Sequence, residues 1–514
     1  MVARSDVDVE HAVLGHARAS AFIPGTNLRG QSGGAAWLFL LPGLELGLVV
    51  CLGAPSAAAL RTLAGIADEV VVCGGRRDRW AARRRCGRAG IAGVRVVAPT
   101  GLPERRPDLV VVTGDGSDPV LPAAVNRARA TFVERPERAP VASGSCELRI
   151  GPAAGEPCLA AAENDTATLS YLERSTACSD IGRRAVLTAQ GLTGGRLEPP
   201  TYIRDIATTS GRDLSGYRLG LAAPTGYASR KTVMFLFRDE DREPELVVKL
   251  ARDPRQNERL ENEWRALRWL NHADVRGELP RPAFFGHHAG LAILGESAVH
   301  GTPFRGTTSA TPDCPLAHGA LDWLLELGRV TAHRPPDEQD VGAALRELTA
   351  RFMAIYRLTT AERAVLRRHV DALAEAGSSL PLVLQHGDPG TWNLLVGADG
   401  APAFLDWEAA ERHGMPLWDA FYFVRSFAVT VARRRRRTSR LAAMRRELLA
   451  DGPLRRLLAA ATDRHCADIG LDRSLVEPLF ATCWMHRALK EATRLSPRRL
   501  DSGHYVNLLR LCLR

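Results

Sequence analysis

The sequence predicts two architectures in succession: an α/β doubly wound domain, then an α+β domain with a small sheet-rich lobe and a larger helical lobe. The chain has 514 residues, more than one domain normally holds, so two or three domains are expected. Continuous apolar strands separated by helices near the N-terminus favour a parallel sheet covered on both faces. From about residue 215, strands with an antiparallel pattern replace them, and beyond Asp313 the chain becomes predominantly helical.

Residues 30–140 carry the first pattern, in which each apolar run ends in polar or Gly-rich residues before the next helical segment. The runs are "LGLVVCLG" at 46–53, "EVVVCGG" at 69–75, "GVRVVAP" at 93–99 and "PDLVVVTGD" at 107–115. The apolar stretch 35–55 is the one candidate for a membrane span. Pro42, Glu45 and several glycines interrupt it, so two short buried strands explain it better.

The remaining chain is expected to hold a connector at residues 141–214 with a helix at 159–175, a small lobe at 215–300 and a helical lobe at 301–514. The first twenty residues contain acids and no apolar core, which argues against a signal peptide. The ten Cys residues show no C-x-x-C pair and no zinc-ligand spacing, so reduced thiols are expected. These features together predict a cytoplasmic protein without a membrane partner.

The net charge of +10 comes from arginine, since 65 of the 68 basic residues are Arg and only three are Lys. Such an excess can indicate a nucleic-acid partner. The Arg run at 432–440 lacks interleaved aromatic residues and belongs to no recognised nucleic-acid-binding module. We therefore expect a solvated helix face there and no nucleic-acid partner.

The segment "VLQHGDPGTWNLLVGADGAPAFLDWE" (383–408) places carboxylates and an amide between short apolar strands. "NLLV" and "APAFLD" are expected to form a hairpin around "GADG", which returns Asp406 beside Asn393, near Asp388. Hard cations such as Mg²⁺ take oxygen ligands and usually keep substrate phosphates in their shell. A carboxylate beside such a cation can accept a hydroxyl proton, so the segment predicts a metal–phosphate site.

"HGDPGTWN" and "LDWE", in this order and spacing, resemble the catalytic centre of the aminoglycoside phosphotransferase/choline kinase-like family, which has a protein-kinase-like fold. The resemblance covers residues 215–505. It implies that Asp388 is the catalytic base or hydroxyl-orienting residue and that Asn393 and Asp406 bind Mg²⁺. It also implies ATP as the phosphoryl donor.

Three further polar residues lie near this motif. We expect His386 to be a buried, hydrogen-bonded residue that orients the loop. Asp419 fits a family position that supports the catalytic loop. Glu408 either helps to position metal or substrate or forms a salt bridge.

Lys249, in the apolar strand "LVVKLA", is the candidate for holding nucleotide phosphates, because this chain uses Arg at almost all of its other basic positions. Its expected ion-pair partner is Glu263 in the helix "NERLENEWRALRWL", with Glu261 as the competitor. Gly226 and Ser229, in "APTGYASRK", are expected to offer donors to the phosphates.

"LAILGESAVHGTPF" (291–304) resembles the linker between the two lobes of kinases. This resemblance implies that adenine bonds to the backbone near Glu296 and Ala298. An ordinary strand that ends in a turn would have the same residues.

The acceptor is expected to be a small-molecule hydroxyl. Protein kinases have an Arg in this motif that binds the phosphorylated activation loop, and an A-P-E motif further on; "HGD" lacks the Arg, and no A-P-E follows. Aminoglycosides, amino sugars, choline-like compounds and related natural products are the classes that the family implies. A pseudokinase-type scaffold for a biosynthetic partner is the alternative. The oligomeric state stays open.

The N-terminal domain faintly resembles class I methyltransferases, with a Gly turn at Gly53 after the first strand. Its second strand ends in Cys73-Gly74-Gly75, without the acid that would bind ribose hydroxyls. A degenerate, Rossmann-like domain with a scaffold or recognition role is expected, ahead of a working methyltransferase.

Overall fold

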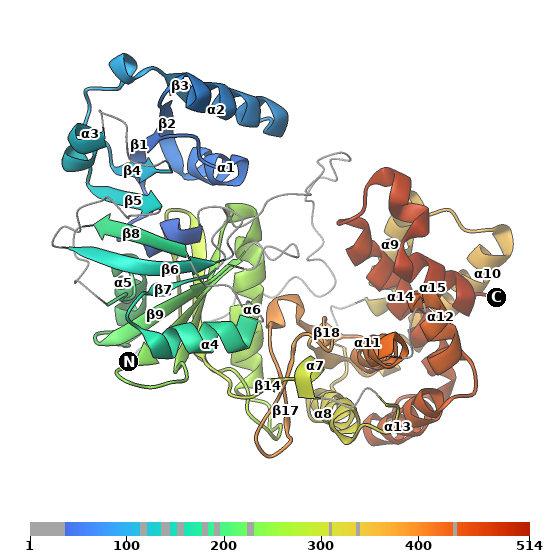
Figure 1. Ribbon diagram of the computed structural model, residues 1–514. Helices are drawn as coiled ribbons and strands as arrows, with labels where there is room; N and C mark the ends of the chain where they lie inside the picture. The colour runs from blue at the N-terminus through green and yellow to red at the C-terminus, as the bar shows by residue number, and fades with distance from the viewer. Residues whose placement is uncertain are drawn as a thin grey trace, which may run out of the picture. The chain divides into compact units, whose positions relative to one another are not determined.

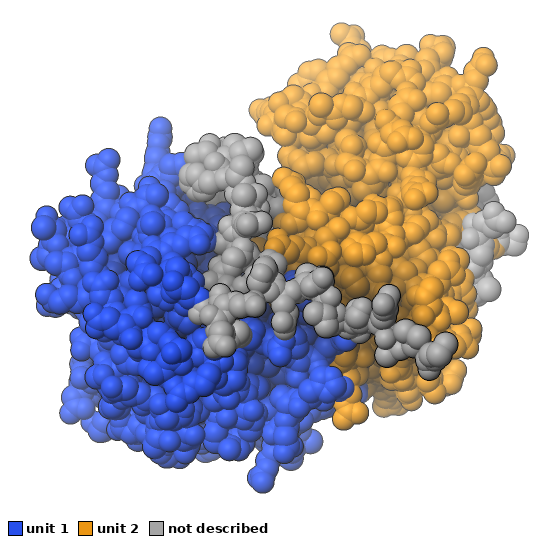
Figure 2. Space-filling model, turned by 180° about the vertical axis from the view of Figure 1, so that it is seen from behind, with its two compact units in different colours: residues 1–28, 265–279, 299–514 blue, residues 29–264, 280–298 orange. Residues whose placement is uncertain are grey.

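The computed structural model describes residues 36–113, 121–134, 144–151, 159–176, 183–189, 196–223, 231–307, 311–335, 340–434 and 439–514. The chain forms two compact units, each drawn in its own colour in Figure 2. The sheet unit comprises residues 29–264 and 280–298, and the helical unit includes residues 265–279 and 299–514. Within the described residues, no helix is both long and apolar enough to cross a membrane.

The first part of the sheet unit is the predicted doubly wound domain. Its strands pair in parallel in the order β3-β2-β1-β4-β5. Its elements are η1 (Ala36–Leu40), β1 (Leu46–Leu52), α1 (Ala57–Ile66), β2 (Ala67–Cys73), α2 (Arg76–Ala89), β3 (Val94–Val97), η2 (Pro99–Gly101), β4 (Leu109–Val112), α3 (Leu121–Arg127) and β5 (Ala130–Glu134).

The described part of the apolar stretch 35–55, from Ala36 onward, contains one strand, β1, instead of the two predicted. Residues 36–40 form the 3₁₀ helix η1, and all five are buried. Trp37 stacks on Phe132 of β5, with ring centroids 3.7 Å apart, so η1 packs against the sheet. A short apolar run that is buried on every side has no periodicity to separate strand from helix, which explains the error.

The segment predicted as a connector continues the same sheet. It contains β6 (Ser145–Gly151), β7 (Leu159–Ala162), α4 (Thr166–Thr176), β8 (Arg183–Ala189) and α5 (Thr201–Thr209). β8 pairs antiparallel with β5, β6 pairs with β8, and β7 pairs with β6. The helix predicted from residue 159 begins at Thr166, where Asp165 accepts a hydrogen bond from the Thr168 amide at 3.0 Å, as N-capping residues do.

The small lobe has the predicted antiparallel sheet, in the order β12-β13-β11-β10-β9. Its elements are β9 (Tyr217–Ala222), β10 (Lys231–Arg238), β11 (Leu246–Ala251), η3 (Pro254–Gln256), α6 (Asn257–Leu270), β12 (Pro282–His288) and β13 (Leu291–Ser297). β9 also pairs with β7, through Leu159↔Ala222 and Ala160↔Leu221. Strands β1 to β13 therefore form one 13-stranded sheet, whose middle portion, β5-β8-β6-β7-β9, can be followed in Figure 1.

The helical unit carries the segment 383–408 on two small sheets among helices, in the orders β14-β16-β17 and β15-β18. Helix α14 packs against α9, α10, α11 and α15. The elements are β14 (Thr302–Pro303), α7 (Phe304–Thr307), α8 (Pro315–Thr331), α9 (Val341–Ile355), α10 (Thr360–Ala376), η4 (Gly377–Ser379), β15 (Val383–Gln385), β16 (Leu394–Val396), β17 (Pro402–Phe404), η5 (Trp407–Ala409), β18 (Glu411–Gly414), α11 (Trp418–Arg434), α12 (Arg440–Met444), η6 (Arg445–Leu449), α13 (Pro453–Ile469), η7 (Arg473–Leu475), α14 (Val476–Ala492), η8 (Pro497–Ser502) and α15 (His504–Cys512).

Candidate active site

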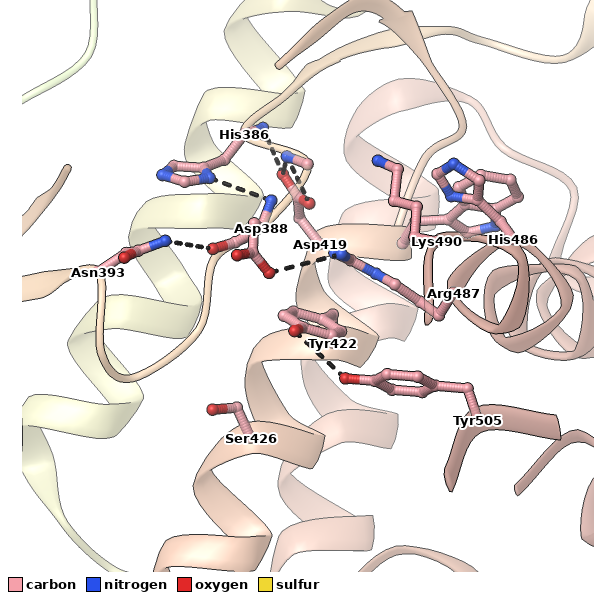
Figure 3. Close-up of polar contacts among 12 residues, drawn as sticks. His386, Asp388, Asn393, Asp419, Tyr422, Ser426, His486, Arg487, Lys490 and Tyr505 are labelled. Carbon is pink, nitrogen blue, oxygen red and sulfur yellow. Dashed lines mark hydrogen bonds and ion pairs between the residues drawn. The ribbon is translucent and has the colours of Figure 1, made fainter. Parts of the chain in front are cut away.

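The candidate catalytic loop, residues 386–393, leaves strand β15 through a tight turn at Gly387. Its φ is +77°, and a Cβ at this position would lie 1.9 Å from the carbonyl oxygen of Ala409. Only glycine fits both the backbone conformation and the space. The Gly387 amide donates to Asp419 Oδ1 at 3.1 Å, and the His386 amide donates to Asp419 Oδ2 at 2.6 Å. Asp419, from the first turn of α11, therefore supports the loop as predicted (Figure 3).

His386 is fully buried and orients the same loop. Its Nε2 lies 2.9 Å from the Leu405 carbonyl oxygen, and its Nδ1 lies 3.2 Å from the Asp388 amide nitrogen. Nδ1 must accept from that amide, so Nε2 carries the proton and donates to Leu405. Burial lowers the pKa of His386, which agrees with a neutral imidazole. His386 is therefore buried and hydrogen-bonded to the loop, as predicted.

The hairpin predicted around "GADG" is present and sets the relation of Asn393 to Asp406. Leu394 pairs with Phe404 across β16 and β17, and the Leu405 amide donates to the Asn393 carbonyl at 2.8 Å. Asp406 follows directly, in the left-handed region with φ of +69°. This conformation is uncommon for a residue other than glycine and clusters at functional sites.

The candidate side chains for holding a divalent cation are those of Asn393 and Asp406. Asn393 Nδ2 donates to the Asp388 carbonyl at 3.1 Å, so its Oδ1 remains as an acceptor. An amide oxygen and a carboxylate fit Mg²⁺, which is usually held by one or two carboxylates plus phosphates and water. Among the described residues, no group of three or more His, Cys, Asp and Glu side chains could hold a metal ion by itself. Glu408 lies in η5, two residues after Asp406 in the sequence.

The sheet unit contains a buried cluster of two lysines and two glutamates. Lys249 Nζ lies 2.6 Å from Glu263 Oε1 and 2.7 Å from Glu296 Oε1, and Lys231 Nζ lies 3.8 Å from Glu263 Oε2. All four residues are at most 9% exposed. Glu261 instead lies 3.3 Å from His287 at the surface, so the structure selects Glu263 as the partner of Lys249.

Lys231 and the side chain of Glu296 were missed as members of this cluster. The scarcity of lysine that singled out Lys249 applies equally to Lys231 and would have found it. Glu296 was expected to contact adenine through its backbone, but β13 directs the Glu296 side chain to Lys249. Burial raises the pKa of Glu296 to about 7, and Lys249 counteracts part of that rise.

The backbone near Ala298 is already engaged. The Ala298 amide donates to the Glu245 carbonyl at 2.8 Å, which extends the β11–β13 pairing by one residue. A nucleobase contact at this position would therefore have to use another group. Gly226 and Ser229, predicted to contact phosphates, lie outside the described residues.

One residue beside Asp388 was not predicted. Arg487, on α14, places Nη1 3.5 Å from Asp388 Oδ1 (Figure 3). In a chain with so many arginines, no feature of the sequence distinguishes Arg487. It is separated from the catalytic loop by about a hundred residues, and only the tertiary fold brings the two together.

Comparison with protein families matches residues 227–461 to the phosphotransferase enzyme family, so the resemblance predicted from the catalytic-loop motif is confirmed for that part of the chain. Comparison with curated protein sequences gave no match. Three similar solved structures are the GDP and kanamycin complex of APH(2")-IIia, the ADP and streptomycin complex of APH(3'')-Id from Streptomyces rimosus, and the bifunctional kinase-methyltransferase WbdD.

The aminoglycoside phosphotransferase structures match the chain only in part. APH(2")-IIia is 15% identical, with a TM-score of 0.38, over 60% of this chain and 98% of its own. APH(3'')-Id is 19% identical, with a TM-score of 0.31, over 55% of this chain and 98% of its own. WbdD is 14% identical, with a TM-score of 0.25, over 82% of this chain and 84% of its own.

Proposed function

Residues 227–461 match the phosphotransferase enzyme family, and on that premise we propose that this protein is an ATP-dependent O-phosphotransferase. It transfers the γ-phosphoryl group of ATP to a hydroxyl of a small molecule. The observation that carries the proposal is the support of the catalytic loop, where Asp419, His386 and Asn393 each hydrogen-bond to the backbone that presents Asp388. Phosphoryl transfer depends on positioning, and a loop held at three points supplies it.

In this proposal, Asp388 accepts or orients the acceptor hydroxyl. Asn393 and Asp406 hold Mg²⁺, which when bound neutralises charge on the phosphates. The ammonium group of Lys249 contacts the nucleotide phosphates, and Glu263 holds that ammonium at 2.6 Å. Gly226 and Ser229 remain candidates for phosphate contacts, and backbone groups near Glu296 and Ala298 other than the Ala298 amide remain candidates for the adenine contact.

We expect an acceptor among aminoglycosides, amino sugars, choline-like compounds and related natural products. η5 and β18 follow Asp406 directly, and α11 begins at Trp418, so a protein kinase's long activation segment has no counterpart here. A protein acceptor is therefore disfavoured.

For the N-terminal domain we propose a degenerate methyltransferase-like fold with a scaffold or recognition role. The Arg85 guanidinium of α2 donates to the carbonyls of Ala54 and Pro55, in the loop after β1 where a dinucleotide-type cofactor would approach. These two carbonyls of the loop are therefore bonded within the domain.

The test is phosphoryl transfer by Asp388→Ala, with Asp399→Ala as the matched control. Asp399 lies in the exposed turn of the β16–β17 hairpin, where its side chain accepts a hydrogen bond from the Ala401 amide at 2.9 Å. A screen of amino sugars, aminoglycosides, macrolides and choline with MgATP first identifies an acceptor. Asp388→Ala should lower kcat by at least about a hundredfold, while nucleotide affinity and the control stay near wild type. Unchanged turnover in Asp388→Ala would end the assignment.

A second candidate function is a pseudokinase-type binding protein, in which the site serves no chemistry. The contact of Lys249 with two carboxylates, Glu263 and Glu296, favours it, because both compete with phosphates for the ammonium. Thermal unfolding with ATP, with and without Mg²⁺, discriminates the two. If ATP raises the unfolding temperature only when Mg²⁺ is present, the enzyme is supported. If ATP leaves the unfolding temperature unchanged with and without Mg²⁺, the binding protein is supported.

A further inference from the structure

Arg487 is a buried cation in contact with the residue proposed to be catalytic. It lies on α14, is 7% exposed, and places Nη1 3.5 Å from Asp388 Oδ1. Figure 3 shows its guanidinium directed toward the Asp388 carboxylate and next to the ring of Tyr422. An unpaired buried charge costs several kcal/mol, so the groups around Arg487 must compensate for its burial.

Two kinds of group stabilise the guanidinium. Its Cζ lies 3.5 Å from the ring centroid of Tyr422, a close cation–π contact, and the Tyr422 hydroxyl lies 3.2 Å from that of Tyr505. Burial alone would lower the pKa of Arg487, but Tyr422 and Asp388 outweigh it and raise that pKa. The guanidinium therefore stays charged, and the stacked ring restricts its position.

The hydrogen bonds of the catalytic loop fix its backbone and leave the Asp388 carboxylate to be fixed by another group. Asp419, His386 and Asn393 all bond to main-chain atoms. Among the described residues, Arg487 is the one side chain with an ion pair or hydrogen bond to the carboxylate, at Oδ1. Oδ2 has no hydrogen-bond or ion-pair partner there, which leaves it available to a substrate hydroxyl.

We infer that Arg487 is a positioning residue, which holds the Asp388 carboxylate by Oδ1 so that Oδ2 faces the acceptor hydroxyl. The inference rests on the proposed function. It separates two tasks: the loop backbone places Asp388, and α14 sets the rotation of its side chain.

Arg425 provides a matched control. It is also a buried arginine, 5% exposed, on α11, with its Cζ 4.8 Å from the ring centroid of Tyr505. Its Nε lies 3.1 Å from His504 Nε2, and no contact joins it to Asp388 among the described residues. Loss of a buried, ring-stacked guanidinium is thus common to Arg425→Met and Arg487→Met, whereas loss of the Asp388 contact belongs to Arg487→Met alone.

The experiment measures phosphate release from MgATP, with water as acceptor, by the full-length chain. Arg487→Met should lower kcat at least tenfold while the KM for MgATP stays within about twofold. Arg487→Lys, which keeps a charge without the planar fork, should recover part of kcat. Arg425→Met should keep kcat within about twofold, even if it lowers the unfolding temperature as much. Arg487→Gln takes the place of Arg487→Met if that variant does not fold.

Two results would overturn the inference: wild-type kcat in a folded Arg487→Met or Arg487→Gln variant, or an equal loss of kcat in Arg425→Met. A wild type that transfers phosphate neither to water nor to any screened acceptor contradicts the proposed function itself. The two failures are distinguishable, because the Arg487 inference can fail only if the wild-type protein is active, whereas the proposed function fails if it is inactive.

Discussion

Glu261 and Glu263 are two positions apart on α6 and face different partners, which allows a comparison at the scale of single residues. Glu263 is fully buried and bonds to Lys249 at 2.6 Å, whereas Glu261 lies at the surface, 3.3 Å from His287. Glu263→Gln should lower kcat/KM at least tenfold, because a neutral amide no longer holds the ammonium. Glu261→Gln should leave kcat/KM within about twofold. Steady-state kinetics with MgATP checks this, and equal kinetics of the two variants would contradict it.

The buried carboxyl of Glu296 should make stability depend on pH. Its pKa rises from 4.5 to about 7 on folding because burial disfavours the charged form. Between those two pH values the folded protein holds a proton that the unfolded chain has lost. Stability should therefore fall as pH rises from about 4.5 to 7 and level off above, by about 3 kcal/mol at most.

Urea unfolding between pH 5 and 8 measures this slope. Glu296→Gln should remove most of it, and Glu261→Gln, at an exposed position, should keep it. A Glu296→Gln variant with the wild-type slope would show that this carboxyl ionises normally in the folded protein.

At the scale of elements, the turn before Asp388 depends on a glycine for two separate reasons. Gly387 has a positive φ, and its Cβ would collide with the Ala409 carbonyl oxygen at 1.9 Å. Gly470, which ends α13, has a similar φ of +67° but open space around a Cβ. Gly470→Ala should cost about 1 kcal/mol, the strain of the left-handed conformation alone.

Gly387→Ala should cost clearly more, by about 2 kcal/mol or above, because the η5 backbone must also move. Its kcat should fall with its stability, since Asp388 is the next residue. Urea unfolding and phosphate release compare the two variants, and equal losses of stability in both would contradict the prediction.

The sequence predicted correctly those helices and strands that depend on neighbouring residues, such as turn residues and the spacing of apolar side chains. The β16–β17 hairpin, the parallel strands near the N-terminus and the Lys249 strand follow from turn residues and periodicity. Arg487 and the side chain of Glu296 could not be predicted, because each contact depends on tertiary packing between segments distant in sequence. The prediction of a first strand in 35–55 was wrong for a different reason. A short segment that is buried on all sides has no alternation of apolar and polar residues that would distinguish a strand from a helix.

At the scale of the whole sheet unit, α4 and β7 join the small lobe to the N-terminal domain. Gly220 of β9 lies under α4, where a Cβ would be 2.6 Å from Thr168 Cγ2. Gly220→Ala should therefore destabilise the protein by about 1–3 kcal/mol. Thr168→Ser in the same chain removes Cγ2, keeps the hydroxyl that bonds to Asp165 at 2.6 Å, and should restore most of the loss.

A double-mutant cycle by urea unfolding measures this coupling. Additive effects of the two substitutions would mean that α4 does not pack on β9 as described. A positive coupling would show that the segment predicted as a connector is part of the small lobe's structure.

The scarcity of lysine has a practical consequence for labelling the protein. Of three side-chain amines in 514 residues, Lys231 and Lys249 belong to one buried cluster, and Lys490 lies 3.4 Å from Glu411 in the helical unit. An acyl-phosphate derivative of ATP transfers its acyl group to amines near its bound phosphates and leaves guanidinium groups untouched. In this chain such a probe has only three side-chain targets, so peptide mass spectrometry can score nucleotide occupancy directly.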